Sequence, residues 1–270
     1  MKKIEKRKAR HKKPVKQTPL HESWKRFKRN KTAMIGLVVV ALLILIAIFA
    51  PLIAPYDYQT QDYTAMLQKP SGAHLFGTDQ FGRDIFSRVM QGTGITFLVS
   101  ITTVVFGMIV GSAIGLIAGY VGGWFDEIIM RINDVLNAFP SMLMALIFVS
   151  FLGTGLLNII LALGILFIPS FARIARSEML RLKELQFVQS AKLSKASAFR
   201  IIFAHILPNA LPSILSSAAV GFNNAVLAEA SLSYLGLGVQ PPNPSLGRMI
   251  NEAGSYLVQA PWFSIAPGVT

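Results

Sequence analysis

The chain has 270 residues, of which 53% are hydrophobic and 14% are charged, and its mean hydropathy is +0.52. Soluble domains carry about 25% charged residues, so this composition excludes an ordinary soluble protein. The formal net charge is +13, and the absence of cysteine excludes disulfides, thiolate metal sites and a cysteine nucleophile.

Residues 1–32 are strongly basic and hold 14 of the 26 Lys and Arg. Such a segment is typical of a nucleic-acid-binding arm, of the start of a signal peptide, or of a cytoplasmic tail near anionic lipid. The apolar run that follows at 33–54 is too long for a signal peptide and long enough to cross about 30 Å of hydrocarbon. We therefore predict a basic cytoplasmic tail at 1–32, a first transmembrane helix at 33–54, and no nucleic-acid partner.

A polar loop is predicted at 55–94, with turn-forming residues around Pro70. The end of this loop has the pattern of a short amphipathic helix that lies at the membrane interface. Its apolar face is made of Ile85, Phe86, Val89 and Met90, and its polar face of Arg83, Asp84, Ser87 and Arg88.

A second span is predicted at 95–119. Glycine recurs in it at every fourth position, which favours close approach of a neighbouring helix in lipid. These glycines are Gly107, Gly111, Gly115 and Gly119. A short polar connector with charges at helical spacing is expected next, before the third span. The further spans are predicted at 137–152, 159–172 and 207–232, and the last apolar stretch, 257–270, is too short to cross, so we expect a truncated sixth span.

The distribution of positive charge predicts the orientation. The first 32 residues hold 14 Lys and Arg, and the segment 173–200 holds seven. The loop 55–94 holds three Lys and Arg, and the sequence after His205 holds only Arg248. With five spans, the N-terminus and 173–200 lie in the cytoplasm, and the loops 55–94 and 236–257 lie outside.

The sequence contains no Walker motif and no G-x-S-x-G motif, and its four histidines lie far apart. We therefore predict no catalytic residue, no metal site and no cofactor bound by this chain. The methionines are scattered over the spans, which favours packing over metal binding. A translocation path whose energy comes from elsewhere fits best. A secondary transporter that works alone is the alternative, and it predicts inverted repeats, broken helices and charged residues at mid-membrane.

Three polar residues of the fifth span are candidates for the lining of such a path: Asn223, Asn224 and Glu229. The two asparagines either line a wet path or bond across a helix interface. Glu229 either faces the external mouth or pairs locally with the loop that follows it.

The segment 173–206 is longer than a connector needs, and it has two interpretations: a cytoplasmic docking surface, or an amphipathic loop lying on lipid. Part of it resembles the cytoplasmic loop of ABC-importer permeases, whose pattern is Glu-Ala-Ala, three residues, Gly, and a later Leu-Pro. The matching positions are Gln189, Ser190, Ala191, Lys195, Leu207 and Pro208. Gln189 replaces the acid, and Lys195 replaces a glycine that permits a turn with positive φ.

Three longer stretches are similar to the dipeptide, oligopeptide and nickel permease group, and more narrowly to its second membrane subunit: HLFGTDQFGRDIFSRVMQG, GYVGGWFDEIIMRINDVLNAFPS and AEASLSYLGLGVQPPNPSLGRMI. The likeness extends from about Trp24 to the last residue. It implies an all-α, multi-pass bundle in the cell membrane, with five full spans, a truncated sixth, and a core permease domain at 95–270 that contains a cytoplasmic coupling loop at 173–206.

The resemblance also implies the mechanism and the partners. A second permease completes the path, two ATPase subunits bind ATP and Mg²⁺ and hydrolyse the ATP, and an extracytoplasmic binding protein delivers a short peptide, or nickel or another metal chelate. This subunit is then not an enzyme. The ATPases are contacted by a coupling helix expected within 186–199, made of Gln186, Phe187, Val188, Gln189, Ser190, Ala191, Leu193, Ser194, Lys195, Ala196 and Ser197.

Overall fold

The computed structural model describes residues 27–270, so most of the predicted basic tail lies outside the described residues. The chain divides into two packing units, one up to Leu43 and one from Ile44 onward. Helix α2 (Lys31–Ile53) begins in the first unit and continues into the second. It is a single apolar helix of 23 residues, which confirms the continuous helix expected at 33–54.

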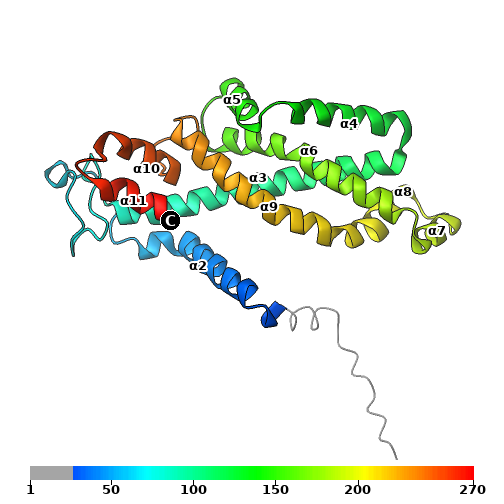
Figure 1. Ribbon diagram of the computed structural model, residues 1–270, viewed down its shortest axis with the longest axis horizontal. Coiled ribbons are helices and arrows are strands. Elements are labelled where there is room, and N and C mark those ends of the chain that lie inside the picture. Colours follow the sequence, from blue (N-terminus) through cyan, green and yellow to red (C-terminus); the bar gives the residue numbers. More distant parts are fainter. Residues whose placement is uncertain (1–26) are drawn as a thin grey trace, which may run out of the picture. The chain divides into compact units, whose positions relative to one another are not determined.

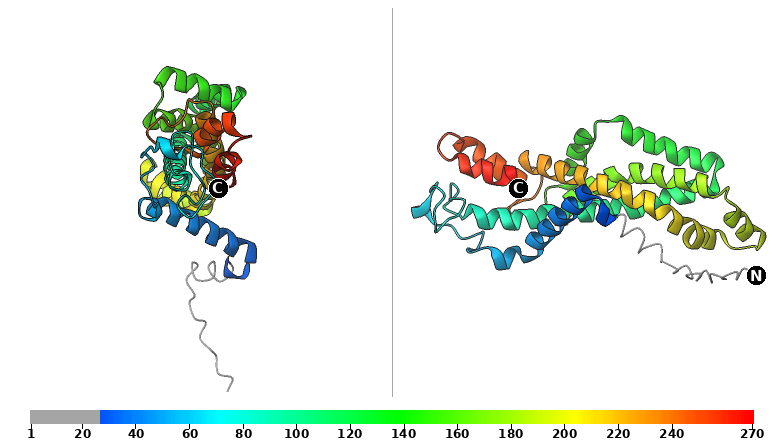
Figure 2. Two further views of the ribbon diagram at one scale, coloured as in Figure 1. Left: turned by 90° about the vertical axis from the view of Figure 1, so that its left-hand side faces the viewer. Right: turned by 60° about the horizontal axis from the view of Figure 1, so that its bottom comes forward.

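Three long helices form the centre of the second unit: α3 (Ile85–Val121), α6 (Leu156–Leu182) and α9 (Leu207–Tyr234). They run alongside one another and contact one another (Figure 1; Figure 2, right). Their buried side chains make two of the apolar clusters of this unit, one nearer α7 (Gln186–Leu193) and one nearer α5 (Ser141–Leu152). The all-α bundle expected from the sequence is confirmed.

The glycine repeat of α3 packs directly against α6. A Cβ added at Gly107 would lie 2.6 Å from the Cβ of Phe167, and one added at Gly111 would lie 2.5 Å from the Ile168 carbonyl oxygen. Any larger side chain would therefore push the two backbones apart. The predicted close helix approach is confirmed.

The short amphipathic helix predicted within 55–94 does not exist as a separate element, because it is the first part of α3. No proline interrupts the chain between Ile85 and the predicted second span, so one helix of 37 residues continues across the expected boundary at 94 and 95. Its polar side does not face water either. Asp84, Ser87 and Arg88 are buried among charged and hydroxyl partners.

The third span predicted at 137–152 is wrong as a continuous helix. The supposed polar connector forms α4 (Gly123–Ala138), and α5 follows after a bend of 97°. The bend falls at Phe139, which is extended because Pro140 disfavours helical angles in the residue before it. Helix α5 has 12 residues and is about 18 Å long, shorter than the hydrocarbon core.

Helix α6 also extends further than predicted, since the supposed start of the cytoplasmic loop at 173 is its last third. The chain then forms α7, α8 (Ala198–Arg200) and a π-helical turn, η2 (Ile201–Ile206), which leads into α9. Pro208 and Pro212 lie in the first turns of α9, where each lacks the N–H that a regular helix requires. In the π turn that precedes them, the N–H of Leu207 donates a hydrogen bond to the carbonyl of Ile202.

Near the start of α3 the chain forms a third apolar cluster, which joins the end of α2, α3, α10 (Leu246–Ala253) and α11 (Pro261–Val269). A short 3₁₀ turn, η1 (Tyr63–Ala65), lies in the preceding loop, and another, η3 (Gly254–Tyr256), follows α10. Figure 1 shows α10 and α11 at one end of this unit and α7 at the other.

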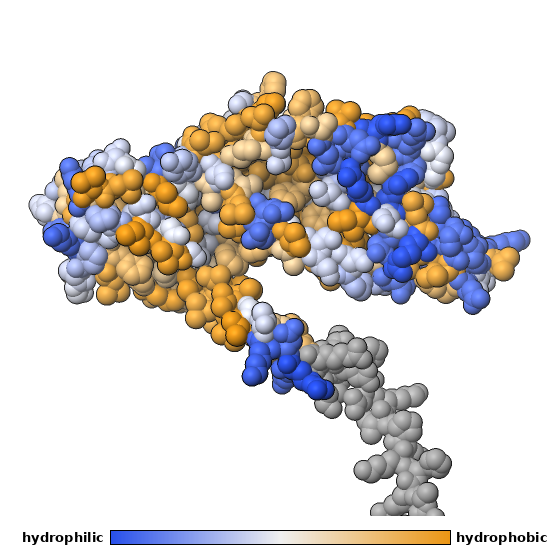
Figure 3. Space-filling view, in the orientation of Figure 1, coloured by the Kyte–Doolittle hydropathy of each residue, from blue (hydrophilic) through white to orange (hydrophobic). Residues whose placement is uncertain are grey.

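Four helices in residues 27–270 are long and apolar enough to cross a membrane, and the bent pair α4–α5 makes five if it counts as one span. The four are Lys31–Ala50, Ile85–Val121, Leu156–Leu182 and Ala198–Tyr234. Figure 3 shows hydrophobic residues over the middle of the helices and hydrophilic residues gathered toward the end that carries α7. This distribution is that of a protein whose middle faces lipid.

Candidate functional site

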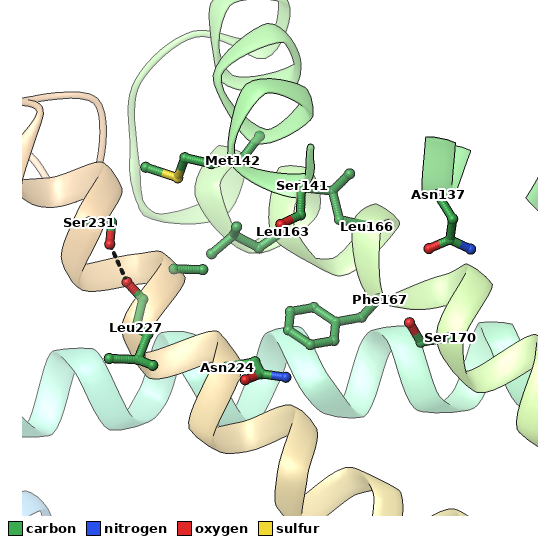
Figure 4. A pocket seen from close by; sticks show the side chains of 12 residues that line it. Asn137, Ser141, Met142, Leu163, Leu166, Phe167, Ser170, Asn224, Leu227 and Ser231 are labelled. Carbon is green, nitrogen blue, oxygen red and sulfur yellow. Dashed lines mark hydrogen bonds between the residues drawn. The ribbon is translucent and has the colours of Figure 1, made fainter. Parts of the chain in front are cut away.

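A cavity of about 510 Å³ opens between α5, α6 and α9 (Figure 4). Its floor is apolar, with Leu163 and Phe167 from α6, and its polar groups come from four helices. These polar residues are Asn137, Ser141, Ser170, Asn224 and Ser231. All of them carry hydroxyl or carboxamide groups, which accept and donate hydrogen bonds without carrying charge.

A second cavity, of about 460 Å³, continues the first along α6 and α9 toward α7. It adds Ser216, Ser217 and Gly221 from the earlier turns of α9. Phe167, Ser170 and Asn224 line both cavities, so the two form one groove. We call these two cavities together the polar groove.

The two asparagines singled out in the sequence are both exposed but differ in position. Asn224 lines both parts of the polar groove, whereas Asn223 lines neither. Ser170, Asn137 and Ser141 were not expected. A lone serine or a helix-end asparagine in an apolar span has no distinct sequence signal, because both occur widely in membrane helices.

Glu229 is fully buried and faces hydroxyl groups from three segments. Thr96 of α3 donates to it at 2.9 Å, Ser233 of α9 at 2.7 Å and Ser245, in the loop before α10, at 3.0 Å. These bonds tie α9 to α3 and to the following loop. The structure thus encloses Glu229 among local partners, away from the lining of the polar groove.

At the other end of the unit, α7 stands between two turns. It has eight residues and ends at Leu193, so the helix is shorter than the stretch 186–199 predicted for it. Val188 is fully buried against the end of α6 and the π turn, while Leu193 is 86% exposed. One face of α7 therefore anchors it to the protein and the opposite side is free in this chain.

Lys195 lies in the turn after α7 with φ = +56°, in the left-handed region. The N–H of Ala196 bonds to the Ala191 carbonyl at 3.1 Å, and the N–H of Lys195 bonds to the Lys192 carbonyl at 2.9 Å. This pair of bonds is the Schellman motif, in which the left-handed position is usually glycine. The turn that the family pattern requires is present although lysine occupies the glycine position.

A buried ion network lies at the α10 end. Arg88 of α3 pairs with Asp79 of the preceding loop and, at 3.0 Å, with Glu252 of α10. Arg83 bonds to Asp79 at 2.7 Å, and Arg248 bonds to Glu252 at 3.0 Å. Burial raises the pKa of the Glu252 carboxyl, but Arg88, Arg248 and Arg83 together outweigh it and hold that pKa below its usual value.

No group of three or more His, Cys, Asp or Glu residues that could hold a metal ion occurs within residues 27–270. The geometry that remains is an uncharged groove along two long helices, lined by hydroxyl and carboxamide groups, with a small anchored helix at one end.

Comparison with known proteins identifies the family. Residues 111–270 match the family described as binding-protein-dependent transport system inner membrane component, which is more than half of the chain. The chain belongs to this permease family. Residues 18–70 also match the N-terminal transmembrane domain of oligopeptide transport permease C.

The permease has close relatives over most of its length. It is 43% identical over 251 residues to the dipeptide transport system permease protein DppC of Alkalihalophilus pseudofirmus, covering 93% of this chain and 83% of the relative. It is 44% identical over 253 residues to the glutathione transport system permease protein GsiD of Pectobacterium atrosepticum, covering 93% and 84%. These relatives confirm the expected group, the second-permease type of the peptide and nickel ABC importers.

The fold is also that of a solved importer. A chain of the inward-facing MetNI methionine ABC transporter aligns with a TM-score of 0.58 at 18% identity, covering 68% of this permease and 88% of that chain. The permease is therefore a multi-pass inner-membrane subunit of a binding-protein-dependent ABC importer. Its relatives are transport subunits, which supports the expectation that it is not itself an enzyme.

Proposed function

We propose that this permease imports short peptides and forms the translocation path together with a second permease subunit. Its relatives carry the names of a dipeptide and a glutathione transport system, and glutathione is itself a short peptide. The relatives therefore favour peptides over the alternative of nickel or another metal chelate. The polar groove supports the proposal, because its hydroxyl and carboxamide groups suit an uncharged or zwitterionic peptide backbone.

The second permease is proposed to cover the polar groove. Asn224, Ser170 and Ser141 are exposed in this chain, at a depth where the surrounding helices are apolar. Exposing such groups to lipid is unfavourable, and pairing with a partner subunit would keep the groove wet and closed to lipid. A binding protein outside the cell delivers the peptide to the α10 end.

Helix α7 is proposed to couple the path to two ATPase subunits, which bind the ATP and Mg²⁺, so this chain binds no cofactor. The N-terminus and α7 then lie in the cytoplasm, and the loop before α3 lies outside. The exposed side of α7, with Leu193 at its end, supports this role, because a free apolar side chain on a polar surface favours a protein contact.

The observation that carries the coupling role is the division of α7 into an anchored face and a free side. Ala191 packs beside the chain's own core, so Leu193 is the better position for a test. Leu193→Arg is expected to weaken co-purification of the ATPase by tenfold or more, since burial of a leucine contributes about 1.5–3 kcal/mol. Peptide-stimulated ATP hydrolysis should fall with it, at unchanged abundance of the permease in the membrane.

Val258→Arg is the matched control, because Val258 is 98% exposed and lies near α11, at the end of the unit away from α7. This variant should keep the co-purification of the ATPase, which does not depend on the binding protein proposed to act at the α10 end. If Leu193→Arg leaves both the co-purification and the stimulation unchanged, α7 is not the coupling element.

A further inference from the structure

The two cavities of the polar groove meet at a junction made of Phe167 and Ser170 on α6 and Asn224 on α9. In Figure 4 the Phe167 ring and the Asn224 carboxamide lie close to each other between the two helices, with Ser170 one turn along α6. A solute that moves along the groove must pass these three side chains, whichever direction it travels.

Most polar side chains on either side of the junction are already bonded to their own helices, and Ser141 at the start of α5 is the exception within residues 27–270. Ser216 donates to the Pro212 carbonyl at 2.8 Å, Ser231 to the Leu227 carbonyl at 2.7 Å, and Asn137 to the Asn133 carbonyl at 3.0 Å. Asn224 and Ser170 make no hydrogen bond to any part of the chain within residues 27–270. Their full hydrogen-bonding capacity is directed into the groove.

A carboxamide offers two N–H donors and a carbonyl acceptor, and a hydroxyl offers a donor and an acceptor. These groups complement the N–H and C=O of a peptide bond, which every dipeptide contains whatever its side chains are. Because both residues are uncharged, they neither attract nor repel a charged side chain of the solute.

We infer that Asn224 and Ser170 are the point of the path that contacts the solute, where they hydrogen-bond the main chain of a passing peptide beneath the Phe167 ring. The inference rests on the proposed function. It follows that passage through this subunit depends little on the charge of the peptide side chains, and that a charge introduced at the junction creates selectivity that the native path lacks.

The test compares import of Ala-Ala, Ala-Glu and Ala-Lys in cells that express the complete transporter with Asn224→Asp. The ratio of Ala-Lys to Ala-Glu import should rise about tenfold over the wild-type ratio, because a fixed carboxylate within a few ångströms discriminates strongly between opposite charges. Asn224→Lys should shift the ratio in the opposite direction. All solutes are measured in the same cells and with the same binding protein, so transporter abundance and delivery cancel from the comparison.

Asn223→Asp is the matched control, since it puts the same charge one residue earlier on α9, where the side chain lines neither cavity. This control should keep the wild-type ratio. If Asn224→Asp fails to assemble, Ser170→Asp carries the same expectation of a raised ratio.

An unchanged ratio in the assembled Asn224 and Ser170 variants would overturn the inference, and so would an equal shift in Asn223→Asp. Either result leaves the proposed function in place as long as the wild type imports the dipeptides. Failure of the wild type to import any of the three would instead overturn the assignment of peptides as the solute, and with it the main-chain contact inferred here.

Discussion

Lys195 adopts the left-handed backbone conformation that glycine usually adopts at the end of a helix. The left-handed conformation costs a residue with a Cβ roughly 1–2 kcal/mol. Glycine avoids this cost but gives up some of the gain through its greater freedom in the unfolded chain. The Schellman bonds and the contact of Ala191 and Ala196 with the core keep the turn in place despite the lysine.

Lys195→Gly is therefore expected to stabilise the end of α7 by about 1 kcal/mol. Amide hydrogen exchange over residues 186–194 should become roughly fivefold slower if these amides exchange by opening of this turn. Lys195→Ala is the control, because it removes the same charge and keeps the Cβ. Equal exchange rates in the glycine and alanine variants would show that the turn stores no strain.

At the scale of elements, the ion network joins three segments that are distant in the sequence: the loop before α3, α3 itself and α10. Apolar residues alone do not hold that loop, since most of its side chains are exposed. The network adds paired charges to the apolar cluster at this end, and removing one partner leaves the others buried without compensation.

Glu252→Gln should thus lower the stability of this end by on the order of 2 kcal/mol at pH 7, with Arg88 keeping Asp79 as a partner. The pKa of Glu252 is lower in the folded protein than in the unfolded chain. Its stabilising contribution is therefore complete above the unfolded pKa, near 4.3, and is lost as the pH falls through the lower folded value.

The thermal unfolding temperature of the purified complex should accordingly drop more for the wild type than for Glu252→Gln when the pH falls from 7 to 3.5. Asp57→Asn serves as the control, because Asp57 is exposed and its carboxylate accepts a hydrogen bond from the nearby Gln59 backbone N–H. A wild type and a Glu252→Gln variant that lose stability in parallel would contradict the role of this carboxylate.

Sequence patterns predicted the structural features that depend on the spacing of neighbouring residues. The glycine repeat of α3 and the long apolar helices follow from such spacing, and the structure has both. Helix α4 stands where a short polar connector with charges at helical spacing was predicted. Two of its aspartates bind arginines of α6. Asp126 accepts two hydrogen bonds from Arg176, at 2.5 and 2.6 Å, and Asp134 accepts one from Arg173 at 2.9 Å.

Such pairs join residues 39 to 50 positions apart, and no local pattern reveals them. The candidate site divides in the same way. Asn224 stands out in an apolar span and was found from the sequence, although its neighbour Asn223 had an identical signal. Ser170 acquires its place only when α6 and α9 pack together.

At the scale of the whole molecule, the proposed orientation makes a direct prediction. The chain has no cysteine, so single-cysteine variants report one position each. Ser71 is exposed in the loop before α3, and Ser194 is exposed at the end of α7. An impermeant thiol reagent should label Ser71→Cys in intact cells and label Ser194→Cys only after the membrane is opened. The reverse pattern would invert the topology.

In the proposed orientation, helix α3 connects these two sides of the membrane without a break. Its 37 residues make a rod about 55 Å long, which carries Arg88 of the ion network near one end and Gly119, whose carbonyl is bonded by Lys183, near the other. A tilt of roughly 5° about one end of such a rod displaces the other end by about 5 Å. In the proposed arrangement, a small change of angle at the end nearer the ATPases is thus a movement of side-chain size at the end nearer the binding protein, because α3 is one continuous helix.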